Sequence, residues 1–127
     1  MPDLLLVLIV DDNDRNRKLA RDVLRAAGFR TLEAATAAEG IALASEHLPD
    51  VVLMDLRLPD ADGTEAVRTL KAQPHTSRIP VVAVTALALD PSGAWLSDAG
   101  FAGYIAKPID TVELPDLVRR LSACTPG

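Results

Sequence analysis

The chain has 127 residues, enough for one domain of ordinary size and too few for two. Apolar residues make up 49% of it and aromatic residues only 3%, so a core must be built from aliphatic side chains. Thirteen basic residues against eighteen acidic ones give a net charge of −5 without a basic cluster, which argues against binding nucleic acid through its phosphates. We therefore expect a single domain over residues 1–127, with a core from about residue 4 to residue 122.

The sequence indicates neither a membrane anchor nor an exported, disulfide-bonded protein. The apolar run Leu4–Val10 is far shorter than the roughly 20 residues that span a bilayer. It also lacks the basic segment and the small-residue cleavage site of a signal peptide. Cys124 is the only cysteine, so a disulfide framework is excluded. These features predict a cytoplasmic protein without membrane contact.

The N-terminal part of the chain predicts two strand and helix pairs. Leu4–Val10 is continuously apolar, which is typical of a strand buried on both faces. A helix should follow from Asn13 or Asp14 to Ala27, with Gly28 as its left-handed stop. Arg30–Ala34 is a weaker strand near an edge. Thr36 can cap a helix to about His47, for which we expect this inward face: Ala38, Ile41, Ala42 and Ser45.

The middle of the chain continues this alternation. Val51–Met54 is a third strand, followed by turn residues over Leu58–Gly63 and a helix over Thr64–Ala72. Ile79–Val84 is the fourth strand. A weak fourth helix should run from Asp90 or Pro91 to Ala99.

Tyr104–Ala106 is the fifth strand, and Thr111–Ser122 is the last helix. Five strands alternating with helices predict an α/β fold, a doubly wound three-layer sandwich with right-handed crossovers around a parallel sheet.

Polar signatures stand at the ends of four predicted strands. Asp11 and Asp12 follow the first strand, Asp55 the third, Thr85 the fourth and Lys107 the fifth. Because parallel strands place their C-terminal ends on one edge of the sheet, these groups should meet there. Neighbouring carboxylates repel one another unless a cation lies between them, and Mg²⁺ prefers oxygen ligands. An ammonium and a hydroxyl can hold phosphoryl oxygens, so the pocket suits attack by a carboxylate on phosphorus.

The set of motifs, in this order and spacing, resembles the receiver domain of bacterial two-component response regulators. The resemblance covers essentially the whole chain. Its motifs are Asp11-Asp12, Asp55, Leu58-Pro59, Asp62-Gly63, Thr85-Ala86, Gly100, Gly103-Tyr104 and Lys107-Pro108. It implies a flavodoxin-like (βα)5 fold with strand order 2-1-3-4-5.

The resemblance also implies a function and a cofactor. Asp55 would accept a phosphoryl group from the phosphohistidine of a histidine kinase or a histidine phosphotransfer protein. Asp12, Asp55 and the backbone carbonyl of Arg57 would bind Mg²⁺, and Asp11 would act through water. Thr85 and Lys107 would contact the phosphoryl group. The domain would be a regulatory phosphoacceptor that assists its own phosphorylation and dephosphorylation, rather than an enzyme acting on other substrates.

A switch is implied as well. In the family, the residue at Thr85 moves toward the phosphoryl group and the aromatic residue at Tyr104 swings inward. This repositions the face made by the fourth helix, the fifth strand and the fifth helix, through which a downstream protein binds. Tyr104 could instead simply fill the core. Trp95 is either a core residue at the edge of this face or an anchor for a partner. Both a monomer and a phosphorylation-linked dimer are compatible with the sequence.

Three other functions compete with this one. A receiver fold could serve as a docking module independently of phosphorylation. A phosphatase with an aspartyl nucleophile, like the haloacid dehalogenases, wants a second acid two residues after the nucleophile, where this chain has Arg57. A flavin-binding role is weaker, because three acids at the strand ends would repel the cofactor phosphate.

Overall fold

The computed structural model describes residues 5–56, 58–60, 63–85, 100–106 and 112–123. Five parallel strands form one sheet in the order β2-β1-β3-β4-β5, which confirms the predicted fold class and strand order. The strands are β1 (Leu6–Val10), β2 (Arg30–Ala34), β3 (Val51–Asp55), β4 (Val81–Thr85) and β5 (Gly103–Ala106). The helices within the described ranges are α1 (Asp14–Ala26), α2 (Ala37–His47), α3 (Gly63–Ala72) and α5 (Glu113–Ala123).

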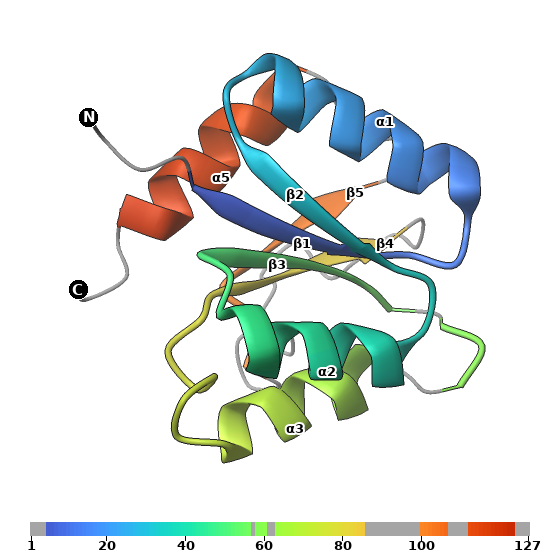
Figure 1. Ribbon diagram of the computed structural model, residues 1–127, viewed down its shortest axis with the longest axis vertical. Helices are drawn as coiled ribbons and strands as arrows, with labels where there is room; N and C mark the ends of the chain where they lie inside the picture. Colours follow the sequence, from blue (N-terminus) through green and yellow to red (C-terminus); the bar gives the residue numbers. More distant parts are fainter. Residues whose placement is uncertain (1–4, 57, 61–62, 86–99, 107–111, 124–127) are drawn as a thin grey trace.

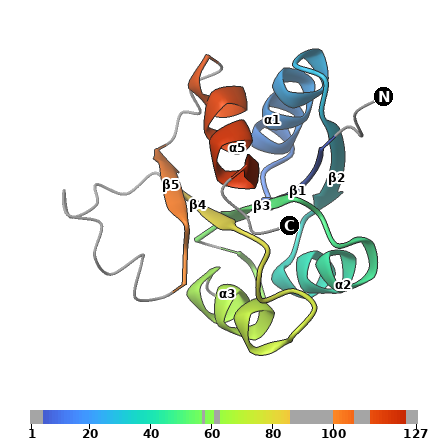
Figure 2. The same ribbon diagram turned by 90° about the vertical axis from the view of Figure 1, so that its left-hand side faces the viewer.

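The helices cover both faces of the sheet. α1 and α5 lie together on one face, and α2 and α3 lie together on the other (Figures 1 and 2). Each face has its own apolar cluster, one centred on Leu53 and Leu24 and the other on Met54 and Leu70. Alternate residues of β3 thus serve opposite layers, because successive side chains of a strand point to opposite faces. This explains why the strand is apolar without interruption.

The first helix begins and ends largely as the sequence predicts. The side chain of Asn13 accepts hydrogen bonds from the backbone N–H groups of Arg15 and Asn16, at 2.9 Å and 3.2 Å, and caps α1. Gly28, just after the helix, has a φ of 98°, in the left-handed region that favours glycine. Leu19 on α1 is 37% exposed, so the buried positions of this helix are Ala20 and Leu24.

The buried face of α2 differs from the predicted one. Ala37, Gly40 and Ala44 are buried, whereas Ala38 and Ala42 are exposed. A Cβ atom on Gly40 would lie 2.7 Å from Cγ2 of Val10, so the helix approaches β1 too closely for a side chain at this position. The predicted face was partly wrong: Ile41 packs against the core as expected, but Ala38 and Ala42 do not. A run of alanines carries little directional signal, and a glycine is not counted as a core residue.

The helix α3 is held at its C-terminal end by the connection that leads to β4. The Lys71 amine donates hydrogen bonds to the carbonyl oxygens of Ser77 and Ile79, at 3.0 Å and 2.8 Å. Burial lowers the pKa of this amine. The buried hydroxyl of Thr76 donates to the carbonyl oxygen of Leu70 at 2.6 Å. These bonds supply donors to carbonyl groups at the end of the helix and in the connection that follows it.

Some predicted boundaries shift, and some fall outside the described residues. β1 begins at Leu6, and residues 1–4 are not among those described. β4 begins at Val81, two residues later than predicted, and α5 begins at Glu113, so that Pro115 falls in its first turn, where proline is tolerated. The fourth helix, expected from Asp90 or Pro91 to Ala99, lies outside the described residues. Among the described helices, none is long and apolar enough to cross a membrane.

Replacing Leu53 with alanine should strongly destabilise the fold. Leu53 lies in β3, between β1 and β4, and is 1% exposed. Loss of its buried methyl groups and the resulting cavity should lower the free energy of unfolding by about 3 kcal/mol. The control is Leu19→Ala on the surface of α1, expected to change it by less than about 0.5 kcal/mol. Urea unfolding measures both, and equal losses in the two variants would contradict the assigned core.

Candidate functional site

The register of the parallel strands brings the predicted acids to one edge of the sheet. Val10 pairs with Met54 across β1 and β3, so the residues that follow them, Asp11 and Asp55, lie next to each other. Asp55 in turn pairs with Val84 of β4. The loops that follow β1 and β3 therefore start side by side. This place is the topological switch point of the sheet, where ligands bind in open α/β folds.

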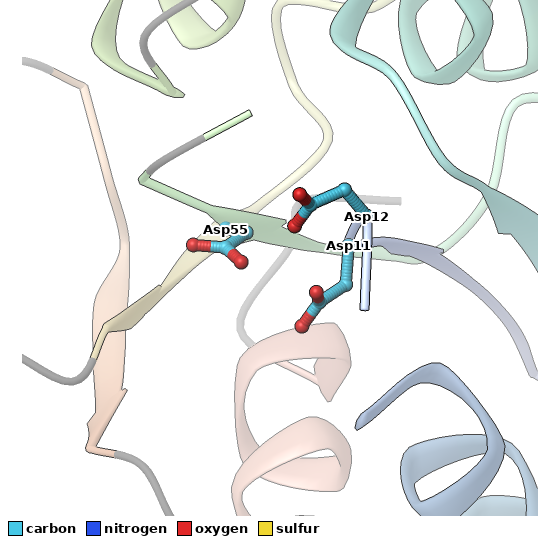
Figure 3. Close-up of side chains that lie close together, drawn as sticks. All are labelled: Asp11, Asp12 and Asp55. Carbon is cyan, nitrogen blue, oxygen red and sulfur yellow. The ribbon is translucent and has the colours of Figure 1, made fainter. Parts of the chain in front are cut away.

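Three carboxylates gather at this edge. One carboxylate oxygen each from Asp11, Asp12 and Asp55 lies within 4.8 Å of the other two. Figure 3 shows Asp11 and Asp12 at the end of β1 and Asp55 at the end of β3. Asp11 and Asp55 are buried, with 3% and 5% exposure, whereas Asp12 faces solvent. Two of the three carboxylates are thus enclosed by the protein, and the third is open to solvent, from which a ligand would enter.

Local hydrogen bonds fix the end of β1. The backbone N–H of Asp11 donates to the carbonyl oxygen of Ala34 at 3.0 Å, which extends the pairing of β1 with β2. The backbone N–H of Asn13 donates to Oδ1 of Asp11 at 2.8 Å and orients this carboxylate. Nη1 of Arg17 donates to the backbone carbonyl of Asp11 at 2.7 Å. The guanidinium also pairs with Asp14 of α1 and Glu33 of β2. Arg17 thus connects α1 to the end of β1 through a hydrogen bond and to β2 through an ion pair.

The backbone just after Asp55 is tightly packed. The N–H of Leu56 donates to the carbonyl oxygen of Val84 at 3.2 Å, and the N–H of Gly63 donates to that of Leu56 at 3.0 Å. A Cβ atom on Gly63 would lie 2.6 Å from the backbone oxygen of Asp55 and 2.9 Å from Cα of Leu56. Only glycine fits there, because both neighbours are backbone atoms that cannot rotate away. Gly63, the first residue of α3, therefore packs directly against the backbone at the end of β3.

This arrangement of charges suits a divalent cation. Two negative charges about 4 to 5 Å apart repel each other by roughly 1 kcal/mol even with the screening of water, and the site holds three. Mg²⁺ binds oxygen ligands in an octahedron and usually uses one or two carboxylates, with waters in the remaining positions. Three carboxylate oxygens from two strand ends fit that donor set.

The remaining predicted site residues fall into three groups. Thr85 ends β4 opposite Ala106 of β5, and its side chain is not among those described. Tyr104 in β5 is 44% exposed, which argues against simple core filling. The others, Arg57, Trp95 and Lys107, lie outside the described residues.

One residue at this edge has a role that the sequence did not indicate. Asp60 follows the Leu58-Pro59 turn, and its carboxylate accepts hydrogen bonds from the backbone N–H groups of Ala37 and Ala38, at 2.8 Å and 3.0 Å. The capping of a helix by a residue more than twenty positions away leaves no local sequence pattern. The sequence indicated only that Asp60 is an acidic residue in a predicted turn.

The comparison with protein families decides what this pocket belongs to. The sequence model of the response regulator receiver domain matches residues 7–119. The chain belongs to this family. Receiver domains are regulatory parts of two-component signalling that interact with histidine kinases and with downstream targets, and they are not enzymes in the ordinary sense.

Receiver proteins of several bacteria are similar to this chain. The polar-differentiation response regulator DivK of Brucella ovis is 38% identical over 113 residues, which cover 89% of this chain and 92% of that protein. A putative response regulator from Chloroflexus aurantiacus superimposes with a TM-score of 0.89 at 30% identity, over 95% of this chain and 99% of the other.

A third relative bears on the metal. The receiver domain of a sensor histidine kinase from Pseudomonas aeruginosa has a TM-score of 0.86 and 33% identity, over 95% of this chain and 99% of that domain. It was solved with a magnesium ion coordinated in its active-site cleft. The acidic cluster of this receiver domain stands at the edge of the same fold, where the family binds Mg²⁺.

Proposed function

We propose that this receiver domain accepts a phosphoryl group on Asp55 from the phosphohistidine of a histidine kinase or of a histidine phosphotransfer protein, in a reaction that requires Mg²⁺. The observation that carries the proposal is the buried carboxylate of Asp55 within 4.8 Å of two further carboxylates at the switch point of the sheet. Carboxylates gathered this closely repel one another unless a cation binds between them, so a cluster of three is better explained by a metal site than by an acid that merely ends a strand.

The proposed metal ligands are Asp12, Asp55 and the backbone carbonyl of Arg57, with Asp11 acting through a water molecule. Bound there, Mg²⁺ would neutralise negative charge on the acids and on the phosphoryl oxygens. Asp11 is already oriented by the N–H of Asn13, and Asp12 is open to solvent. This difference supports an inner position for Asp12 and an indirect role for Asp11.

In the proposed reaction an oxygen of Asp55 attacks phosphorus, while the phosphorus–nitrogen bond of the phosphohistidine breaks and its electron pair returns to the imidazole. No general base is required, because a carboxylate at neutral pH is already ionised. Thr85 and Lys107 would hold phosphoryl oxygens through a hydroxyl and an ammonium. The chain would thereby assist its own phosphorylation by alignment and charge neutralisation. It would assist its own dephosphorylation in the same way, when water attacks phosphorus, the bond between phosphorus and the Asp55 oxygen breaks, and inorganic phosphate leaves.

The proposed output is a change in the face that includes β5 and α5. Thr85 would move toward the phosphoryl group and Tyr104 would turn inward, favouring one of two packings. The exposure of the Tyr104 ring supports this role, since a side chain that is 44% exposed has surface to lose on turning inward. A downstream protein would bind this face, with Trp95 as a candidate anchor. Action as one domain in the cytoplasm also remains a prediction from the sequence.

Phosphorylation by a small donor tests the proposal. Incubation with acetyl phosphate and Mg²⁺, followed by intact mass spectrometry, should show one phosphoryl adduct. Chelation of the metal and the variant Asp55→Asn should each remove that adduct. No adduct on the wild-type protein, or an equal yield on Asp55→Asn, would refute the proposal. Unchanged binding of a partner by Asp55→Asn, together with a lack of Mg²⁺ affinity, would instead support a phosphorylation-independent docking module.

A further inference from the structure

The carboxylate of Asp60 joins two segments that are distant in the sequence. Oδ1 accepts the N–H of Ala37 at 2.8 Å and Oδ2 accepts the N–H of Ala38 at 3.0 Å. These N–H groups belong to the first turn of α2, where no carbonyl of the helix can reach them. Asp60 itself lies in the connection between β3 and α3, which begins directly after the acceptor Asp55.

The helix already has a cap of its own. Thr36 accepts the N–H of Glu39 through its hydroxyl at 3.1 Å, as a local N-cap does. Asp60 accepts hydrogen bonds from the two N–H groups that Thr36 does not reach, those of Ala37 and Ala38. Its negative charge lies at the positive end of the helix dipole. The N–H groups of Ala38 and Ala37 lower the pKa of the Asp60 carboxyl, which keeps it charged. The two caps are therefore separate: one within the helix, and one between the helix and the loop.

The N-terminal end of α2 is rigidly connected to the end of β1. Gly40 packs so closely on Val10 that a Cβ atom would lie 2.7 Å from it, and Val10 is the residue before Asp11. The N–H of Asp11 also binds the carbonyl oxygen of Ala34, three residues before the start of α2. A fixed α2 thus defines the position of the acids on β1.

On the other side, the loop with Asp60 is connected to Asp55. Leu56 is held by Val84 and by Gly63, and Leu58 packs against the core cluster under α2 and α3. Among the described residues of this loop, Asp60 is the one whose side chain is hydrogen-bonded to α2. Besides the direct pairing of β1 with β3, a second connection between the two groups of acids therefore runs from the end of β1 through α2 to Asp60, in the loop that follows Asp55.

We infer that Asp60 is a positioning residue, which sets the spacing between the acids of β1 and the segment after Asp55, and hence the affinity of the pocket for Mg²⁺. This inference rests on the proposed function. Asp60 acts through the hydrogen bonds to Ala37 and Ala38 and touches neither the metal nor the phosphoryl group.

The test compares Mg²⁺ binding by the wild-type protein and three variants, using isothermal titration calorimetry. Asp60→Ala removes both bonds to α2 and should weaken Mg²⁺ binding about tenfold, the cost of ordering roughly one residue on binding. Asp60→Asn keeps an oxygen for one bond but loses the charge, so we expect a smaller loss of about threefold. Thr36→Ala is the matched control, because it weakens the same helix end without releasing the loop.

Melting temperatures separate positioning from stability. Both Asp60→Ala and Thr36→Ala should melt below the wild-type protein, but Thr36→Ala should keep its Mg²⁺ affinity within about twofold. Equal affinity of Asp60→Ala and wild type, or equal losses in Asp60→Ala and Thr36→Ala, would overturn the inference and leave the proposed function standing. A wild-type protein without Mg²⁺ affinity would contradict both.

Discussion

Asp12→Asn is expected to weaken Mg²⁺ binding severely and, at the same time, to raise the melting temperature of the metal-free protein. The first effect follows from the loss of a charged ligand. Even a group that only supports a ligand costs about 10- to 100-fold in metal affinity, so the ligand itself should cost at least about 100-fold. Isothermal titration calorimetry with Mg²⁺ measures this loss.

The second effect has the opposite sign, because the acids repel one another when no cation is bound. Oxygens of Asp11, Asp12 and Asp55 lie within 4.8 Å of each other, and removing one charge relieves two repulsions. With the screening expected for an exposed side chain, the gain should be about 1 kcal/mol, or about 3 °C in melting temperature.

A matched control distinguishes the site from a general effect of charge. Asp22→Asn also removes one negative charge, but from a residue paired with Lys18 on the surface of α1 at 3.0 Å. That pairing lowers the pKa of Asp22, so its charge stabilises the fold at neutral pH, and the variant should melt slightly lower. A fall in the melting temperature of metal-free Asp12→Asn would show that the acids do not repel one another as the geometry requires.

Gly63→Ala should both destabilise the fold and displace Asp55, the proposed acceptor. The added Cβ atom would meet the backbone oxygen of Asp55 at 2.6 Å, well inside van der Waals contact. Since neither backbone can rotate away, α3 or the end of β3 must move. We expect a loss of about 2 kcal/mol in the free energy of unfolding from overpacking. Displacement of Asp55 by even a fraction of an ångström should slow phosphorylation by acetyl phosphate about tenfold or more.

Gly28→Ala serves as the control for this variant. Gly28 has a φ of 98°, and a Cβ atom added to it would meet no atom within 4 Å, so alanine there is strained without a clash. It should lose about 1 kcal/mol of stability and phosphorylate at the wild-type rate. Normal phosphorylation of Gly63→Ala, or an equal slowing in Gly28→Ala, would show that the contact with Asp55 does not position the acceptor.

The acidic edge was predictable because it depends on one rule that the sequence itself displays. Apolar runs without alternation indicate buried parallel strands, and parallel strands end on the same side. Asp11, Asp12 and Asp55 needed only that rule to be placed near one another. Which of them is buried was not predictable, since burial depends on how α1 and α3 close over the strand ends.

Helix orientation was harder to predict. In α2 the alanines stand on several faces, so hydrophobic periodicity could not decide between Ala37 and Ala38 as the inward residue. The decision lies in the contact of Gly40 with Val10, a long-range packing detail. The same holds for Asp60, whose partners Ala37 and Ala38 follow a different strand. Local patterns indicate a turn at that position and give no sign of the interaction across the loop.

The attachment of α3 at both ends limits how this domain can respond to a change at Asp55. At one end, Gly63 lies so close to the backbone of Asp55 that a Cβ atom would not fit, and at the other the Lys71 amine donates hydrogen bonds to two carbonyl groups. A helix clamped in this way has little freedom to slide along its own axis. A change at Asp55 that required α3 to move along its axis would therefore have to break the hydrogen bonds of Lys71 at one end and open the close packing at Gly63 at the other.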